Sequence, residues 1–198
     1  MLVVCLDLEG VLVPEIWIQV SLKTGIKELA LTTRDVPDYD VLMRRRIEIL
    51  RRNRIPLKEV QRVIASMKPL PQAAAFLNQL RARHQVIILS DTFDEFAMPL
   101  MKQLLFPTIF CNSLQVDRSG YVVGYRLRQP DGKKKAVRAL QSIGFRVHAA
   151  GDSYNDVSML KAADRGIFFN PPDKILKQHP QFKVTRKYGE LFKSLTSL

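Results

Sequence analysis

Two acidic side chains near the amino terminus have a spacing that suits metal-assisted chemistry. Asp7 and Glu9 are separated by one residue and follow an apolar run of strand length at residues 2–6. Open α/β sheets bind their ligands at the carboxyl ends of the strands, where these two carboxylates would lie. Acids held this close repel each other unless a hard divalent cation binds them or one takes up a proton. We therefore predict that this strand carries a catalytic or metal-binding site.

Two later apolar runs, at residues 85–89 and 146–150, also end in polar residues. These polar residues are Ser90, Asp91 and Thr92 after the first run, and Asp152, Ser153, Asn155 and Asp156 after the second. Asp91 or Ser153 alone could simply cap a helix, and we keep that alternative for both. In a parallel sheet all three strand ends meet at one edge, which predicts a metal-assisted phosphoryl-transfer site.

Alternating strands and helices predict the fold that positions these side chains. We expect a Rossmann-like α/β fold, with a mostly parallel sheet covered by helices on both faces. The expected strands are 2–6, 85–89, 108–111, 146–150 and 166–169, and the expected helices are 15–24, 37–53, 57–67, 72–83, 93–104, 133–143, 155–163 and one C-terminal helix. Residues 114–128 alternate around Asp117-Arg118-Ser119-Gly120, which predicts a β-hairpin.

The stretch 15–71 interrupts this alternation because it reads as helical throughout and closes with Pro69 and Pro71. Proline does not continue a helix, so this pair marks the end of the segment. We expect a small helical cap at 15–71, inserted after the first strand. The catalytic core would then consist of residues 1–14 and 72–198.

The order of these motifs resembles the four-part signature of the haloacid dehalogenase-like phosphatases. The matching motifs are Asp7-Leu8-Glu9-Gly10, Ser90-Asp91-Thr92, a later lysine, and Gly151-Asp152-Ser153-Tyr154-Asn155-Asp156. The helical insertion is similar to the small cap of the phosphoserine phosphatase branch. Residues 5–17, 32–43 and 149–156 look like the bifunctional phosphoserine phosphatases that also transfer phosphate to homoserine. Glu9 departs from the common pattern, which has aspartate there.

The resemblance implies roles for the acidic residues. Asp7 would be the nucleophile and form an aspartyl phosphate. Glu9 would protonate the departing alcohol oxygen and later deprotonate the acceptor. The carboxylates of Asp7 and Asp152, with the backbone carbonyl of Glu9, would bind Mg²⁺, the cofactor that the family implies. Asp156 would orient metal-bound water.

The resemblance also implies the substrate contacts. Ser90 would hydrogen-bond a phosphoryl oxygen with help from the backbone amide of Asp91, and Asn155 would contact the substrate. The implied substrates are phosphoserine and, as a phosphate acceptor, homoserine. Water would compete with homoserine for the same intermediate.

Three adjacent lysines at 133–135 offer the cation of the third motif, and helical periodicity chooses between them. Lys133 lies three and four residues before two apolar residues, and thus on the buried stripe of its helix. Lys134 and Lys135 fall on other sides of that helix. We expect Lys133 to hold the phosphoryl group and to offset the charge of Asp7, as the family alignment also favours.

The same periodicity singles out one arginine of the helix 37–53. Arg46 falls in the middle of the apolar side, unlike the other arginines of that helix. It could be a snorkelling or structurally paired arginine. The resemblance favours a second interpretation, in which its planar guanidinium binds the substrate carboxylate. Glu15 is the matching candidate for the substrate ammonium group, and a helix N-terminal acid is its alternative.

Two alternatives to this function stay open. The formal net charge of +12 suggests a basic protein that binds nucleic acid on the same fold. The cations are spread over several elements without a nucleic-acid-binding motif, so this alternative is remote and we do not expect nucleic acid as a partner. Within the phosphatase class, the alternative is another small phosphate ester or nucleotide as the substrate.

The remaining features concern location and assembly. No segment reaches the roughly 20 consecutive apolar residues of a membrane helix, so we expect no membrane partner. Cys5 and Cys111 lack metal-ligand spacing, which favours buried free thiols in a reducing cytoplasm. We therefore expect a cytoplasmic protein. The sequence leaves open whether the chain forms a homo-oligomer.

Overall fold

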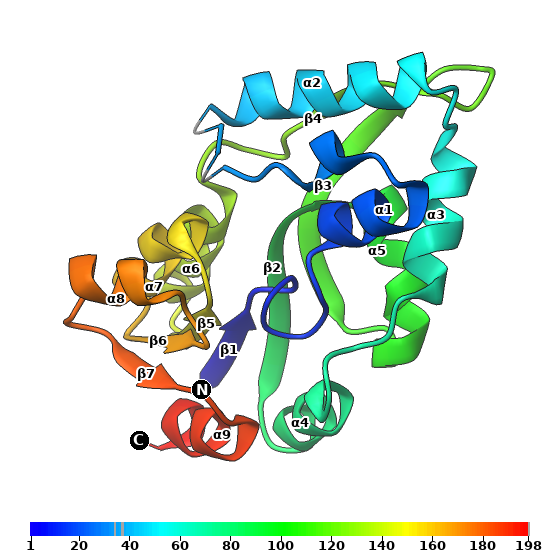
Figure 1. Ribbon diagram of the computed structural model, residues 1–198. Helices are drawn as coiled ribbons and strands as arrows, with labels where there is room; N and C mark the ends of the chain where they lie inside the picture. The colour runs from blue at the N-terminus through cyan, green and yellow to red at the C-terminus, as the bar shows by residue number, and fades with distance from the viewer. Residues whose placement is uncertain (34, 37, 198) are drawn as a thin grey trace.

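A computed structural model describes residues 1–33, 35–36 and 38–197 of the chain. Within these residues, seven strands form one sheet in the order β4-β3-β2-β1-β5-β6-β7 (Figure 1). Their bounds are β1 Leu2–Leu6, β2 Gln85–Phe93, β3 Thr108–Val116, β4 Val122–Arg126, β5 Arg146–Gly151, β6 Arg165–Phe169 and β7 Lys183–Thr185. All neighbouring strands are parallel except β3 and β4, which form the expected hairpin. The expected mostly parallel α/β sheet is confirmed.

The central strand β1 pairs with β2 on one side and with β5 on the other. The three strands run in the same direction, so their carboxyl ends lie at one edge of the sheet. The strand order therefore brings the motifs that start at Asp7, Ser90 and Asp152 to a common place, although they are far apart in the sequence.

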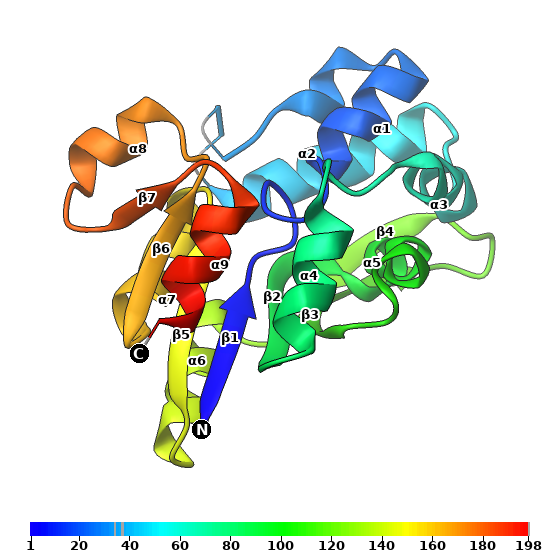
Figure 2. The same ribbon diagram turned by 90° about the horizontal axis from the view of Figure 1, so that it is seen from below.

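Helices cover both faces of the sheet (Figure 2). They are α4 Ala73–Arg81, α5 Asp94–Met101, α6 Gly132–Ser142, α7 Val157–Ala162, α8 Asp173–Gln178 and α9 Tyr188–Thr196, with 3₁₀ turns η2 Lys102–Leu104 and η3 Tyr154–Asp156. Successive side chains of a strand point to opposite faces. Val4 and Leu6 accordingly belong to the core shared with α4 and α9, whereas Val3 and Cys5 belong to the core shared with α6 and α7.

Between β1 and α4 the chain forms a group of helices, which we call the helical segment. Its elements are α1 Ile16–Thr24, η1 Lys27–Ala30, α2 Tyr39–Arg52 and α3 Leu57–Ser66. Asp38 caps α2 because its carboxylate accepts hydrogen bonds from the amides of Asp40 and Val41 at 2.9 and 3.1 Å. The expected start of this helix at Pro37 lies outside the described residues. In the part of the chain that is described, no helix is both long and apolar enough to cross a membrane.

The helical segment packs directly on the rest of the fold. The ring of Trp17 in α1 meets Phe96 of α5 edge to face, with 5.3 Å between the ring centres. At the start of α3, the amide of Leu57 donates a hydrogen bond to the carbonyl of Gly120 in the β3–β4 turn at 2.9 Å. α2 contacts β4, since the hydroxyl of Tyr125 donates a hydrogen bond to Asp40 at 2.6 Å, and it lies over the carboxyl edge of the sheet (Figure 1).

The structure corrects three expected elements. β2 does not end at residue 89 but continues to Phe93, which pairs with Asn112 beyond an irregularity. The expected strand 108–111 and the first hairpin strand are one strand, β3. The prediction of one C-terminal helix is wrong, because α8 and α9 are separated by β7. β7 is an edge strand of three residues that pairs only with β6, so it leaves no local pattern to detect.

Gly166 of β6 lies where α7 approaches the sheet, and this yields a stability prediction. A Cβ atom at Gly166 would lie 2.4 Å from the carbonyl oxygen of Leu160, so Gly166→Ala must displace backbone. We expect this substitution to lower the free energy of unfolding in urea by about 2–3 kcal/mol.

The matched control is Gly189→Ala in α9, where a Cβ atom meets open space. This change should leave stability unaltered or raise it by about 0.5–1 kcal/mol, because alanine favours the helix. Equal effects of the two substitutions would contradict the close packing of α7 on β6.

Candidate active site

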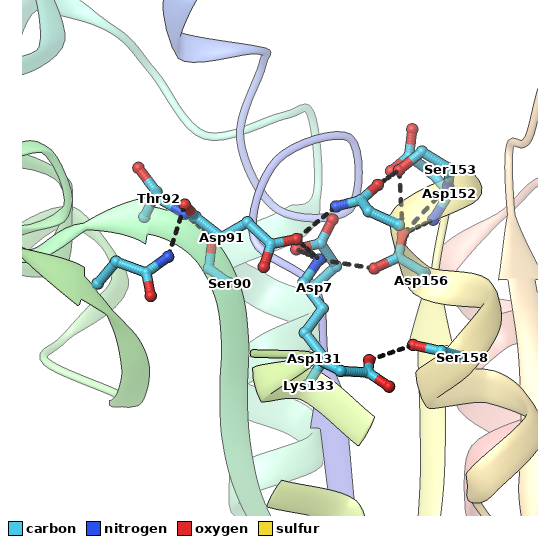
Figure 3. Close-up of polar contacts among 12 residues, drawn as sticks. Asp7, Ser90, Asp91, Thr92, Asp131, Lys133, Asp152, Ser153, Asp156 and Ser158 are labelled. Carbon is cyan, nitrogen blue, oxygen red and sulfur yellow. Dashed lines mark hydrogen bonds and ion pairs between the residues drawn. The ribbon is translucent and has the colours of Figure 1, made fainter. Parts of the chain in front are cut away.

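Three carboxylates converge at the carboxyl edge of the sheet. Asp7 follows β1, Asp152 follows β5, and Asp156 lies in the turn η3 (Figure 3). Each offers an oxygen atom that lies within 4.8 Å of the other two. All three residues are at least nine-tenths buried. Burial in a medium of low dielectric makes their mutual repulsion strong, so this group needs nearby positive charge.

Lys133 in the first turn of α6 supplies one positive charge. Its ammonium nitrogen lies 2.8 Å from Asp7 Oδ1, 2.7 Å from Asp156 Oδ1 and 3.3 Å from Asp91 Oδ2. Burial alone would lower the pKa of Lys133, but the carboxylates of Asp156 and Asp7 raise it well above its usual value. The lysine is therefore a permanent cation and a fixed donor beside Asp7.

Asp156 has little capacity left for a ligand. One carboxylate oxygen accepts the hydrogen bond from Lys133, and the other accepts from the amides of Asp152 and Ser153 at 3.0 and 3.1 Å. These bonds fix the loop that carries Asp152. Two glycines make room for this arrangement, because a Cβ atom would lie 2.4 Å from the Asp152 carboxyl at Gly10 and 2.3 Å from the Asp156 carboxyl at Gly151.

The site suits a hard divalent cation. Burial and the charge of Asp156 raise the pKa of Asp7 well above its usual value, which marks an excess of negative charge around it. Carboxylate oxygens are the ligands that Mg²⁺ prefers in proteins. Hydrogen bonds occupy both carboxylate oxygens of Asp156, whereas Asp7 and Asp152 line a cavity and would be the side-chain ligands.

Glu9 lies next to Asp7 and has the properties of a proton-transfer group. Its Oε2 accepts a hydrogen bond from the amide of Ile16, in the first turn of α1, at 2.7 Å. Burial, followed by the charge of Glu15, raises the pKa of Glu9 to about 7. A carboxyl group with a pKa near neutrality can give up and take back a proton at physiological pH.

Arg46 points from α2 into the same site. Only 7% of its surface is exposed. One terminal nitrogen donates to the carbonyl of Leu31 at 2.7 Å, and the guanidinium lies over the ring of Trp17, 4.6 Å from the ring centre. Within the described residues its Nε has no hydrogen-bond partner and no carboxylate forms an ion pair with it. Arg46 is thus a buried cation with an unused donor.

Ser90, Asp91 and Asn155 form the opposite wall. Ser90 is buried, and its Oγ accepts a hydrogen bond from the amide of Thr92 at 3.2 Å. The carboxylate of Asp91 accepts a hydrogen bond from the side-chain amide of Asn155 at 2.7 Å. It also reaches Lys133, a contact that the sequence analysis did not predict.

A cavity of about 140 Å³ joins these groups. The predicted residues that line it are Asp7, Glu9, Glu15, Arg46, Ser90, Asp91, Asp152 and Asn155. Lys133 does not line it but donates hydrogen bonds to both Asp7 and Asp156. Lys134 and Lys135 are exposed, as expected.

We did not predict Trp17 or Tyr39 as residues of the site. Trp17 lines the cavity and supports the guanidinium of Arg46. Tyr39 lines the cavity, and its hydroxyl donates to the carbonyl of Asp91 at 3.4 Å. Both occupy the first turn of a helix in the helical segment, next to Glu15 or to the cap Asp38. That position is the only signal in the sequence that could have found them.

The fold and the site define the class of protein. Residues 6–161 match the family model described as haloacid dehalogenase-like hydrolase. The chain belongs to this family.

Two relatives are similar to this chain over most of its length. The chain is 54% identical over 189 residues to the phosphoserine phosphatase ThrH of Pseudomonas aeruginosa, covering 96% of this chain and 92% of that protein. It is 53% identical over 191 residues to a phosphoserine phosphatase of Pseudomonas syringae pv. tomato, covering 96% of this chain and 81% of that protein.

Solved structures share the fold. One is a phosphoserine phosphatase in its apo form, with a TM-score of 0.77 and 22% identity over 96% of this chain and 97% of that chain. Another is a phospho-aspartyl intermediate analogue of phosphoserine phosphatase, with a TM-score of 0.77 and 21% identity over 96% of this chain and 97% of that chain.

The raised pKa of Glu9 predicts how stability depends on pH. Because the folded protein holds the proton up to a pH of about 7, whereas the ordinary value is 4.5, protonated Glu9 favours the folded state. This contribution is complete below pH 4.5 and is lost as the pH rises to about 7.

We expect the free energy of unfolding of the native chain, minus that of Glu9→Gln, to fall by about 3 kcal/mol across this window. Urea unfolding with a chelator present measures it, so that no divalent cation alters the titration. A difference that stays constant with pH would contradict the raised pKa.

Proposed function

We propose that this chain is a Mg²⁺-dependent phosphatase that hydrolyses O-phospho-L-serine through an aspartyl phosphate at Asp7. It also transfers the phosphoryl group to homoserine. One observation carries the choice of substrate. The cavity that contains Asp7 and Glu9 also contains the buried guanidinium of Arg46, with a donor that no atom of the described residues uses. Removing a cation from water without a carboxylate partner is unfavourable, so a substrate carboxylate would complete this site.

The cavity supports a small zwitterionic substrate. Its volume of about 140 Å³ suits a phosphorylated amino acid. Arg46 and Glu15, which lines the same cavity, provide opposite charges for a carboxylate and an ammonium group. Both come from residues 15–71, whereas Asp7, Ser90 and Lys133 come from the rest of the fold. We therefore propose that 15–71 is a cap that recognises the amino acid, over a core of 1–14 and 72–198 that carries out phosphoryl transfer.

In the first step, a carboxylate oxygen of Asp7 attacks phosphorus and the bond from phosphorus to the serine oxygen breaks. Glu9, protonated in part at neutral pH because its pKa is raised to about 7, gives its proton to the departing oxygen. Lys133 and the hydroxyl of Ser90 hold the phosphoryl oxygens. Mg²⁺ bound by Asp7, Asp152 and the Glu9 carbonyl would neutralise phosphate charge so that the anionic carboxylate can approach.

In the second step, Glu9 takes a proton from the acceptor, whose oxygen attacks phosphorus and releases the Asp7 carboxylate. Water as acceptor gives phosphate, and homoserine gives phosphohomoserine. The same side chains serve both acceptors, so the balance depends on which one occupies the cavity. The buried free thiols of Cys5 and Cys111 support a cytoplasmic location, which we propose as well.

Incubation of the protein with phosphoserine and Mg²⁺, with and without homoserine, tests this function by identification of the products. We expect phosphate and serine in both reactions and phosphohomoserine only in the second. Nucleoside monophosphates serve as the comparison substrates. Phosphate release from nucleotides but not from phosphoserine would contradict the proposal.

Arg46 gives a sharper test of substrate recognition. We expect Arg46→Gln to lower kcat/KM for phosphoserine by about 10- to 100-fold, because a charge-assisted hydrogen bond to the carboxylate is lost. For phosphoethanolamine, which has no carboxylate, the same substitution should cost less than about threefold, since no such bond exists to lose. Steady-state kinetics with both substrates measures the difference.

The matched control is Arg45→Gln, since Arg45 is the adjacent arginine and is exposed. It should leave both substrates unaffected. If Arg46→Gln slows both substrates equally, Arg46 supports the fold of the site and does not bind the carboxylate.

A further inference from the structure

The catalytic cavity is not the largest hollow near Asp7. A second cavity of about 760 Å³ adjoins it, between the end of the β3–β4 hairpin, the start of α6 and α8. The two cavities share the lining residues Thr33, Tyr39, Ser90, Asp91, Tyr154 and Asn155. Of these, Asp91 and Asn155 are joined by a hydrogen bond of 2.7 Å. Their side chains therefore connect β2 to η3 across the boundary between the two cavities.

Asp91 is also the third carboxylate at Lys133. An ammonium group has three donors. Here three carboxylates surround it, with Asp156 at 2.7 Å, Asp7 at 2.8 Å and Asp91 at 3.3 Å (Figure 3). A phosphoryl oxygen that binds Lys133 must displace one of them. Asp91 has the longest contact and a side chain that is 43% exposed, against 6% for Asp7 and 0% for Asp156.

The backbone of Asp91 is fixed by two hydrogen bonds, whereas its side chain is partly exposed. The carbonyl of Asp91 accepts hydrogen bonds from the side-chain amide of Asn112 at 3.0 Å and from the hydroxyl of Tyr39 at 3.4 Å. The carboxylate has only the exposed Asn155 and Lys133 as partners among the described residues. The side chain can therefore swing into the larger cavity without moving the amide that is expected to contact phosphate.

We propose that the carboxylate of Asp91 is a gate that competes with phosphate for Lys133. This inference rests on the proposed function. A phosphate group that enters meets the negative charge of Asp91 and must displace it. Phosphoserine has additional contacts, at Arg46 and Glu15, that offset this repulsion, whereas free phosphate has none. The gate lowers the affinity for both ligands, and free phosphate, which lacks those contacts, is then released more readily.

Calorimetric titration with inorganic phosphate in the presence of Mg²⁺ tests the gate directly. We expect Asp91→Asn to bind phosphate about tenfold more tightly than the native chain, because one like charge beside a partly solvated site is removed. Asp91→Ser, which also removes the carboxylate, should change the affinity in the same direction. Unchanged or weaker phosphate binding in both variants would overturn the proposal.

The matched control is Asp131→Asn. Asp131 lines the larger cavity but not the catalytic one, and it pairs with Ser158 and Lys134 rather than with Lys133. Its replacement should change phosphate affinity by less than about twofold, as expected for an exposed charge. If Asp131→Asn raised the phosphate affinity as much as Asp91→Asn, the overall charge, and not the gate, would set the affinity.

A second readout separates this inference from the proposed function. During phosphoserine hydrolysis, phosphate should inhibit Asp91→Asn at about one-tenth of the concentration needed for the native chain, following the tenfold gain in affinity. If the native chain does not hydrolyse phosphoserine, the proposed function fails, while the calorimetric comparison still decides the gate. If it hydrolyses phosphoserine but phosphate affinity does not change, only the gate fails.

Discussion

The charge balance around Lys133 is the constraint on which the rest of the site depends. Three buried carboxylates, Asp7, Asp152 and Asp156, lie within 4.8 Å of one another, and one buried ammonium group faces them. A single cation cannot neutralise this group, and water is largely excluded from it. The remaining negative charge makes the site a strong receptor for a divalent cation. Under the proposed function, such a cation would let Asp7 approach an anionic phosphate.

The order of the strands and the position of α6 bring this charge cluster together. β1 lies at the centre of the sheet, so Asp7 reaches the ends of both β2 and β5. α6 begins directly beside that edge and projects Lys133 toward it, with Lys134 and Lys135 directed outward. Asp156 uses its carboxylate to fix the Asp152 loop. Among the described residues the helical segment contributes no group to this cluster, but its Arg46 and the preceding Glu15 line the cavity beside it. Under the proposed function, recognition and chemistry therefore come from different parts of the chain.

Local patterns in the sequence were sufficient for the features that depend on neighbouring residues. Helical phase identified Lys133 among three lysines and Arg46 among several arginines, because burial follows the helical period. Strand ends marked Asp7, Ser90 and Asp152. Features that depend on distant partners were missed. The contact of Asp91 with Lys133 joins β2 to α6, and the stacking of Arg46 on Trp17 joins α2 to α1. The short strand β7 exists only because β6 pairs with it.

The most direct test of this account is to locate the phosphoryl group on the protein. The chain is mixed with phosphoserine and Mg²⁺, quenched in acid during turnover, digested and analysed by mass spectrometry. The account predicts that the peptide containing Asp7 gains the mass of one phosphoryl group, that hydroxylamine removes it, and that Asp7→Asn shows no such gain. Rapid turnover of phosphoserine with the added phosphoryl mass on a serine or histidine, or on no peptide at all, would contradict the account.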